Sequence, residues 1–196
     1  MKKEIVLSGV GGQGVVSIGE VMGLASLHEE HLNATMSASY GSEARGTFTK
    51  TDVILSDGMV GYPNVAVPDL ILCLAQVAYD RYVDKFTDDT LVFYDSDEVK
   101  LKEGARGTSI GYPFRQMAVE LGSIQSANFI ALGVMVKKTG LLKPESVEQG
   151  IAKRFAGKQK VIDSNRKAFE KGLFFICGTM AVPTAFLHYS YICISA

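Results

Sequence analysis

The sequence predicts a single three-layer α/β/α domain built on a mostly parallel or mixed sheet. Three observations indicate this fold class. An apolar run opens the chain and passes through a glycine-rich turn into a helical pattern. Two further apolar runs, residues 70–74 and 91–94, are continuous, as in strands that are buried on both faces. Helical patterns separate the runs, and 196 residues suffice for one domain with a full core.

The first element is a strand through Ile5, Val6 and Leu7 that ends in a glycine-rich turn. The residues of this turn are Gly9, Gly11, Gly12, Gln13 and Gly14, and a helix is expected from Val15. Glycines permit backbone angles that side chains forbid, and the N–H groups at a helix start attract anions. The loop therefore suits a phosphate, a carboxylate or a closely packed backbone. A tight turn without any ligand stays open as well.

The spacing of the glycines also matches the dinucleotide fingerprint, which needs an acidic residue about twenty positions further on. The second strand is expected at residues 32–36, and it leads into Ser37 and Ala38, not into Asp or Glu. Glu29 and Glu30 precede that strand. A site for NAD is therefore disfavoured, and an anion-binding or partner-facing loop is the better interpretation.

The middle of the chain continues the alternation of strands and helices. Residues 47–56 begin with strand-like alternation and are rich in β-branched side chains, and Asp57-Gly58 then turns the chain. The elements expected next are a strand at 70–74, a helix at 76–82, a strand at 91–94, a short strand at 108–111 and a helix at 114–121. This order indicates a sheet covered by helices.

Helices dominate the last part of the predicted domain. Residues 127–135 are apolar nearly all round, as in a buried helix, so the Asn128 amide must find partners inside the protein. Pro144 suits the first position of the next helix, and its apolar stripe consists of Val147, Ile151 and Phe155.

A last short helix, capped by Asp163 or Ser164 and ended by Gly172, is expected to close the domain at residues 1–172. Residues 173–196 form a separate, mostly apolar tail without any Asp, Glu, Lys or Arg. Its length approaches that of a membrane span, but its glycine, proline and histidine make a poor one. Packing on the domain or on a partner subunit is the expected role. A membrane anchor and a disordered or aberrant end are the alternatives.

Composition disfavours several classes of function. Twenty basic and 21 acidic residues give a formal charge of −1, so there is no basic footprint for nucleic acid. Cys73, Cys177 and Cys193 lie far apart in the sequence, which is not the pattern of a zinc site or an iron–sulfur cluster. His28 and His31 have no evident third metal ligand. An odd number of thiols fits a reducing cytoplasm, and no secretion signal is recognisable.

A second notable segment, residues 39–46, is expected as a loop between two strands. Its candidate functional residues are Tyr40, Gly41, Glu43, Arg45 and Gly46. The glutamate and the arginine could form a solvated ion pair of little energetic value. Loops that combine arginine with an aromatic residue are nevertheless favoured at interfaces and anion sites. We expect this loop beside the glycine loop, because both should follow parallel strands.

Together, Gly9-x-Gly11-Gly12-Gln13-Gly14-Val15 and Ser39-Tyr40-Gly41-Ser42-Glu43-Ala44-Arg45-Gly46 resemble the gamma subunit of the 2-oxoacid:ferredoxin oxidoreductases. Later features occur in a similar order, among them Tyr62-Pro63, Pro68-Asp69 and the 128–133 helix, so the resemblance covers about residues 3–172. The chain departs from the family pattern at Thr47, where a second glycine is common, and in its apolar tail.

The resemblance implies a subunit of an enzyme that oxidatively decarboxylates a 2-oxoacid onto coenzyme A and passes the electrons to ferredoxin. Thiamine diphosphate, Mg²⁺ and iron–sulfur clusters are expected in thiamine-binding and ferredoxin-like partner subunits, because this chain lacks the motifs that hold them. The amino-acid sequence of residues 39–45 is more similar to that of the 2-oxoglutarate type than to that of the pyruvate type.

The resemblance therefore predicts no catalytic residue in this chain, and it leaves the two loops as cofactor-binding or interface residues. Two other classes of function stay open. A free-standing nucleotide-binding α/β enzyme would use the glycine loop for its own ligand. A non-catalytic adaptor would use the apolar tail for docking or membrane attachment.

Overall fold

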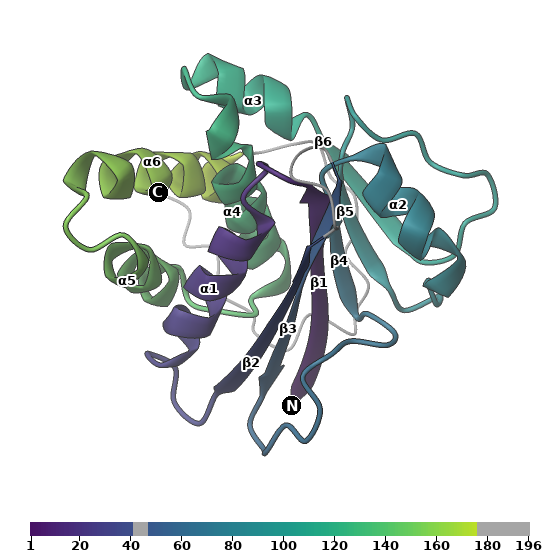
Figure 1. Cartoon of the computed structure of the whole chain (residues 1–196), viewed down its shortest axis with the longest axis horizontal. Helices are drawn as coiled ribbons and strands as arrows, with labels where there is room; N and C mark the ends of the chain where they lie inside the picture. The colour runs from purple at the N-terminus through teal and green to yellow at the C-terminus, as the bar shows by residue number, and fades with distance from the viewer. Residues whose placement is uncertain (41–46, 176–196) are drawn as a thin grey trace, which may run out of the picture.

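The computed structural model describes residues 1–40 and 47–175 and shows one six-stranded sheet with helices on both sides (Figure 1). The strand order is β2-β3-β1-β4-β5-β6. The strands are β1 (Lys2–Val10), β2 (Asn33–Tyr40), β3 (Phe48–Ser56), β4 (Leu70–Cys73), β5 (Leu91–Asp95) and β6 (Thr108–Tyr112). The helices are α1 (Val15–Ser26), α2 (Gln76–Tyr82), α3 (Phe114–Glu120), α4 (Ala127–Thr139), α5 (Pro144–Arg154) and α6 (Gln159–Phe174), with 3-10 turns η1 (Val83–Lys85) and η2 (Ile124–Ser126).

The sheet is mixed in direction. β1, β4, β5 and β6 are parallel neighbours, whereas β3 runs antiparallel to both β1 and β2. The short connection from Tyr40 to Phe48 requires this direction for β3, because parallel neighbours need a long crossover. β1 and β2 are consequently parallel to each other, with β3 between them. The expected fold class, a mostly parallel or mixed α/β sheet, is confirmed.

The helices cover the two faces of the sheet unequally. α1 and α3 to α6 lie over one face, and α2 lies over the other (Figure 1). Ile5 and Leu7 of β1 enter the larger core with the five helices, while Val6 enters the smaller core with Tyr79 of α2. Successive strand residues separate in this way because their side chains point to opposite faces of the sheet. The expected three layers are therefore present.

α4 is the central helix of the larger core, with ten of its 13 residues buried. α6 crosses it at a pair of glycines. A Cβ on Gly133 would lie 2.2 Å from the Phe169 carbonyl oxygen, and a Cβ on Gly172 would lie 2.0 Å from the Ile130 carbonyl oxygen. Gly172 therefore serves a close helix crossing. The expectation that it ends the last helix is wrong, since α6 continues to Phe174 and buries Leu173.

The start of α6 also differs from the expectation. The helix begins at Gln159, so Asp163 and Ser164 lie inside it and do not cap it. The Gln159 side chain donates a hydrogen bond to Asp163 one turn later (2.7 Å), which occupies the carboxylate that was expected to cap. The expected start of α5 at Pro144 is confirmed.

The connection from β5 to β6 contains no α-helix. Residues 96–107 cross the α2 face of the sheet instead, and Val99 is buried in the smaller core. Two backbone groups of this connection are held by α2. The Lys100 N–H donates to Gln76 Oε1 (2.7 Å), and the Lys102 N–H donates to the Tyr79 hydroxyl (3.1 Å). The connection from β5 to β6 therefore belongs, together with α2, to the layer that covers this face of the sheet.

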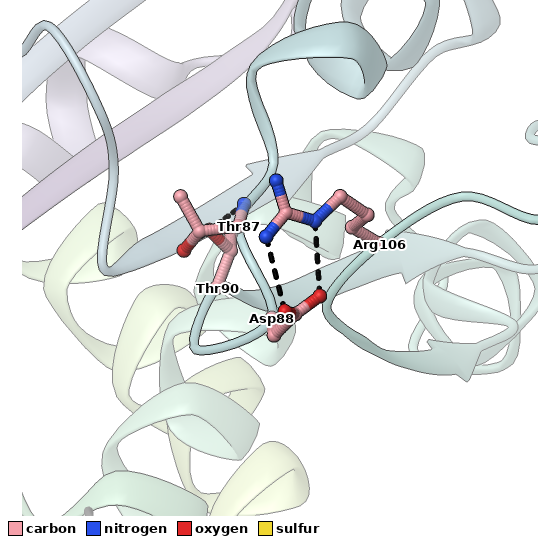
Figure 2. Close-up of polar contacts among 4 residues, drawn as sticks. All are labelled: Thr87, Asp88, Thr90 and Arg106. Atoms are coloured by element: carbon pink, nitrogen blue, oxygen red, sulfur yellow. Dashed lines mark hydrogen bonds and ion pairs between the residues drawn. The ribbon is translucent and has the colours of Figure 1, made fainter.

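Figure 2 shows an ion pair at the end of this connection, near the amino ends of β5 and β6. Arg106 donates from Nε and Nη2 to the two carboxylate oxygens of Asp88, at 2.9 and 3.0 Å. Hydrogen bonding from Arg106 lowers the pKa of the Asp88 carboxyl. Both side chains are exposed, so the pair contributes little stability. The pair links the residues that precede β5 to those that precede β6, at the amino ends of these strands.

No helix within residues 1–40 or 47–175 is long and apolar enough to cross a membrane. Most of the expected tail, residues 176–196, lies outside the described residues. The domain boundary at residue 172 stays a prediction, and Phe175 extends the ordered packing beyond it, because its ring meets the Tyr112 ring at 5.9 Å.

Gly133→Ala should destabilise the protein, whereas Gly23→Ala should stabilise it. Both glycines lie inside helices, but a Cβ on Gly23 would meet no atom within 4 Å. Alanine at Gly23 should therefore add about 1 kcal/mol to the free energy of unfolding through helix propensity. Alanine at Gly133 should lower it by about 2 kcal/mol, because α6 must move away. Urea unfolding of the two variants checks the pair. Equal stabilisation by both would contradict the close crossing of α4 and α6.

Candidate functional site

The glycine loop, residues 11–14, joins β1 to α1 at the carboxyl edge of the parallel strands. Gly12 (φ 98°) and Gly14 (φ 71°) adopt backbone conformations that other residues rarely take. The Gly11 N–H donates to the Thr47 carbonyl (2.9 Å), and the Gln13 N–H donates to the Val10 carbonyl (3.1 Å). The strand, glycine turn and helix expected from the sequence are confirmed.

The Gln13 side chain connects two strands. Its Oε1 accepts a hydrogen bond from the Val10 N–H (2.8 Å), and its Nε2 donates to the Leu74 carbonyl (2.9 Å). Gly9 makes room for this amide, since a Cβ there would lie 2.3 Å from Gln13 Oε1. The bridge fixes the glycine loop to the ends of β1 and β4 at once.

The buried Asn128 supports the other end of the loop. Its Nδ2 donates to the Gly14 carbonyl (3.1 Å), and its Oδ1 accepts from the Phe129 N–H (2.8 Å). The amide thus finds the internal partners that an apolar helix requires. A Cβ on Gly14 would lie 2.3 Å from Asn128 Nδ2, so the loop and α4 fit together only with glycine at this position.

A cavity of about 230 Å³ opens beside the loop. Gly12 is on its wall, and a Cβ on Gly12 would meet no atom within 4 Å. The chain leaves β1 toward α1 on one face of the sheet and leaves β4 toward α2 on the other face. Ligands of open α/β sheets bind at such a reversal, outside the carboxyl ends of the strands. The cavity is therefore the candidate functional site. Its wall also includes Gln13, Leu74, Asp95, Glu98, Arg115, Ile124, Gln125 and Ala127.

Asp95 and Arg115 determine much of the charge of this cavity. Asp95 is 2% exposed, and burial raises the pKa of its carboxyl. Its two oxygens accept hydrogen bonds from the Asp97 N–H (3.1 Å) and the Arg115 N–H (2.9 Å). The Arg115 guanidinium pairs with the Glu98 carboxylate. The side chains of the wall therefore offer no uncompensated cation, and attraction for an anion must come from loop N–H groups or from another segment.

The structure brings together the first group of expected site residues. Gly9, Gly11, Gly12, Gln13 and Gly14 all lie at the carboxyl end of β1. The second group is only partly described. Tyr40 is the last residue of β2 and pairs with Thr49 of β3. Gly41, Glu43, Arg45 and Gly46 lie outside the described residues.

Two expectations about the second segment can be compared with the structure. Ser39 and Tyr40 belong to β2 and not to a loop, because backbone pairing with β3 extends the strand beyond residue 36. β1 and β2 are parallel, as expected, so both lead to the same edge of the sheet. The bond from Gly11 to Thr47 joins the glycine loop to the residue that follows the 41–46 segment.

Sequence reasoning named none of Asp95, Arg115, Asn128 or Gln125 as a site residue. Asn128 had a detectable signal, a single amide in an apolar helix. Asp95 follows the strand expected at residues 91–94, where an Asp-Ser-Asp sequence is typical of a solvated turn, although Asp95 is buried. Arg115 and Gln125 have no local signal, because only the tertiary fold brings them to the cavity.

The described residues hold no group of three or more His, Cys, Asp or Glu side chains placed to bind a metal ion. Cys73 is fully buried, and burial raises the pKa of its thiol to about 12. It is therefore a packed thiol and not a reactive thiolate. Cys177 and Cys193 lie outside the described residues.

The family model described as "Pyruvate ferredoxin/flavodoxin oxidoreductase" matches residues 4–174. The 2-oxoglutarate synthase subunit KorC of Methanocaldococcus jannaschii is 36% identical over 176 residues, which are 88% of this chain and 92% of that protein. The ketoisovalerate oxidoreductase subunit VorA of Methanothermobacter thermautotrophicus is 35% identical over 170 residues, which are 86% of this chain but only 35% of that protein.

A crystal structure has the same fold over nearly the whole described chain. It is the gamma subunit of a keto/oxoacid ferredoxin oxidoreductase from Geobacter sulfurreducens, with a TM-score of 0.76 and 32% sequence identity. The match covers 88% of this chain and 94% of that subunit.

Gly14→Ala should destabilise the isolated chain more than Gly12→Ala. Each change forces a side chain onto a left-handed backbone, at a cost of about 1 kcal/mol. Only the Cβ at Gly14 also displaces the Asn128 amide and breaks its buried hydrogen bond, which adds about 1 to 2 kcal/mol. The free energies of unfolding of the two variants in urea check this order. Equal losses would show that Asn128 does not support the loop.

Proposed function

The chain belongs to the pyruvate ferredoxin/flavodoxin oxidoreductase family, and on that basis we propose that it is the gamma subunit of an enzyme that oxidises 2-oxoglutarate. In this reaction the oxoacid loses carbon dioxide, its acyl group forms a thioester with coenzyme A, and the electrons released reduce ferredoxin. The observation that carries the proposal is the near end-to-end similarity to a 2-oxoglutarate synthase subunit.

The choice of 2-oxoglutarate rests on two features. The 2-oxoglutarate synthase subunits KorC of Methanocaldococcus jannaschii and Archaeoglobus fulgidus are each 36% identical to this chain, and the matches cover 92% and 87% of those subunits. The Ser39-to-Arg45 sequence also resembles the 2-oxoglutarate type more than the pyruvate type. A branched-chain 2-oxoacid is the alternative substrate, because a ketoisovalerate oxidoreductase subunit is 35% identical to this chain.

The proposal assigns the redox chemistry to other chains. Thiamine diphosphate, Mg²⁺ and iron–sulfur clusters belong in thiamine-binding and ferredoxin-like partner subunits, and coenzyme A is a co-substrate of the complex. The buried thiol of Cys73 does not suit a cluster ligand. We place the assembled enzyme in the cytoplasm, where such clusters and free thiols are kept reduced.

In this assignment the glycine loop and the Tyr40–Gly46 segment form one cofactor-binding or interface site. The Thr47 carbonyl accepts a hydrogen bond from the Gly11 N–H. Arg45 precedes Thr47 by two residues, so the Cα atoms of Arg45 and Thr47 are at most about 7 Å apart. We propose Arg45 as a cation that serves the cavity, because the Arg115 guanidinium already pairs with Glu98. Its partner would be an anionic group of coenzyme A or a carboxylate of another subunit.

The first test is the activity of the complex. Copurification with its partner chains should yield an enzyme that reduces ferredoxin with 2-oxoglutarate and coenzyme A, and the isolated chain should be colourless and inactive. Pyruvate and ketoisovalerate, offered in place of 2-oxoglutarate, are the controls. Faster turnover with either control substrate would reject the substrate assignment and keep the subunit assignment. Activity or a stoichiometric cluster in the isolated chain would reject the subunit assignment.

The second test separates the role of the two loops from their stability. Arg45→Ala should lower the 2-oxoglutarate activity of the reconstituted enzyme about tenfold, the equivalent of one charge-assisted contact, and leave the melting temperature of the isolated chain nearly unchanged. Gly12→Ala should lower activity as well, because its methyl group enters the cavity wall.

Gly104→Ala is the matched control for Gly12→Ala. Gly104 also has a positive φ (72°) and open space around its Cβ position, but it is not on the cavity wall. It should lose similar stability and keep activity. If Arg45→Ala destabilises the isolated chain as much as Gly12→Ala does, the arginine is structural and the proposed role is wrong.

A further inference from the structure

β2 forms an open outer edge of the sheet. It comes first in the strand order, and within residues 1–40 and 47–175 β3 is its only hydrogen-bonded neighbour. None of residues 33–39 is buried, whereas seven of the nine residues of β3 are. One side of the β2 backbone therefore presents N–H and C=O groups that no strand of the described chain pairs with.

The strand itself lacks the charged residues, proline and bulge that commonly protect an edge strand. Its register with β3 is continuous from Asn33 opposite Ser56 to Tyr40 opposite Thr49, so no bulge interrupts it. Residues 33–40 include no charged residue and no proline. Natural edge strands commonly carry lysine, proline or a bulge to prevent pairing with another chain. An eight-residue edge without any of these is a template for a further strand.

We propose that β2 pairs antiparallel with β2 of a second copy of this chain, about a two-fold axis at Ser37. Directly opposite residues then lie on the same face of the joined sheet. On the α1 face, Met36 lies opposite Ala38 of the second copy, a large side chain against a small one. On the other face, Thr35 lies opposite Ser39 of the second copy, and such hydroxyl pairs stabilise neighbouring strands.

The face assignment follows from the register with β3. Met36 pairs with Val53 of the larger core, and a Cβ on Gly19 of α1 would lie 3.3 Å from Met36 Sδ. Thr35 pairs with Ile54 of the smaller core and so lies on the α2 face.

A second copy is the occupant because the strand complements itself. It is neutral, so two copies meet without like charges, and a two-fold axis satisfies both edges with one contact. The opposite edge is a poorer candidate. β6 has only five residues, and the Phe175 ring packs against Tyr112 at its carboxyl end. Pairing along one strand buries little area, so the expected dimer is weak, with a dissociation constant of about micromolar order.

Sedimentation velocity of the full chain, from low to high micromolar concentration, tests the proposal. The unmodified chain should shift from monomer to dimer. Ser37→Lys and Ser37→Glu should each remain monomeric, because two like charges meet at the axis. An equimolar mixture of the two variants should restore a one-to-one dimer. Ser109→Lys, the same change on β6, is the matched control and should leave the dimer intact.

Hydrogen exchange of the unmodified chain gives a second measurement that needs no variant. Amides of residues 33–40 should exchange more slowly at high than at low concentration, while those of β6 should not change. A chain that is monomeric at all concentrations would overturn the proposal. A dimer that persists in both Ser37 variants would place the association on another face and overturn the proposal. A mixture of the two variants that stays monomeric would also overturn it.

Discussion

The Gln13 side chain makes a hydrogen-bonded bridge between the ends of β1 and β4, and the position of the glycine loop depends on this bridge. β1 and β4 are parallel neighbours as far as Ser8 and Cys73, and the Leu74 N–H still donates to the Ser8 carbonyl (3.0 Å). Beyond that point the chain leaves the two strands toward opposite faces of the sheet. Gln13 continues the pairing by one step with a side-chain amide, from Val10 to Leu74. The glycine loop is therefore fixed to both strands, although it belongs to only one of them.

The distance in sequence between interacting residues explains why some of the fold could be predicted and some could not. The opening strand, turn and helix were predictable because each signal is local: an apolar run, four glycines and a helical pattern. The buried strands were predictable for the same reason. Gly172 was misinterpreted because glycine at a helix end and glycine at a helix crossing look the same in sequence. Only the contact with Gly133 distinguishes them, and the two residues are 39 positions apart.

The candidate site shows the same division. Its glycines could be found from spacing alone, but its charges come from Asp95, Glu98 and Arg115, near the end of β5 and the start of α3. An aspartate at the end of a strand, such as Asp95, is usually exposed to solvent. Here the backbone N–H groups of Asp97 and Arg115 use both of its oxygens and allow it to be buried. Such a role depends on where α3 begins in space, which no local pattern specifies.

The two proposed surfaces of the molecule are linked through one stretch of chain. Residues 41–46 begin where β2 ends at Tyr40, and they are followed by Thr47, whose carbonyl accepts the Gly11 N–H. A strand that pairs with β2 acts on the first of these ends, and a ligand or subunit at the glycine loop acts on the second. If occupation of one end changes the free energy of binding at the other, linkage requires the effect to be reciprocal. Association through β2 and binding at the glycine loop should then affect each other, and Tyr40 belongs to both surfaces.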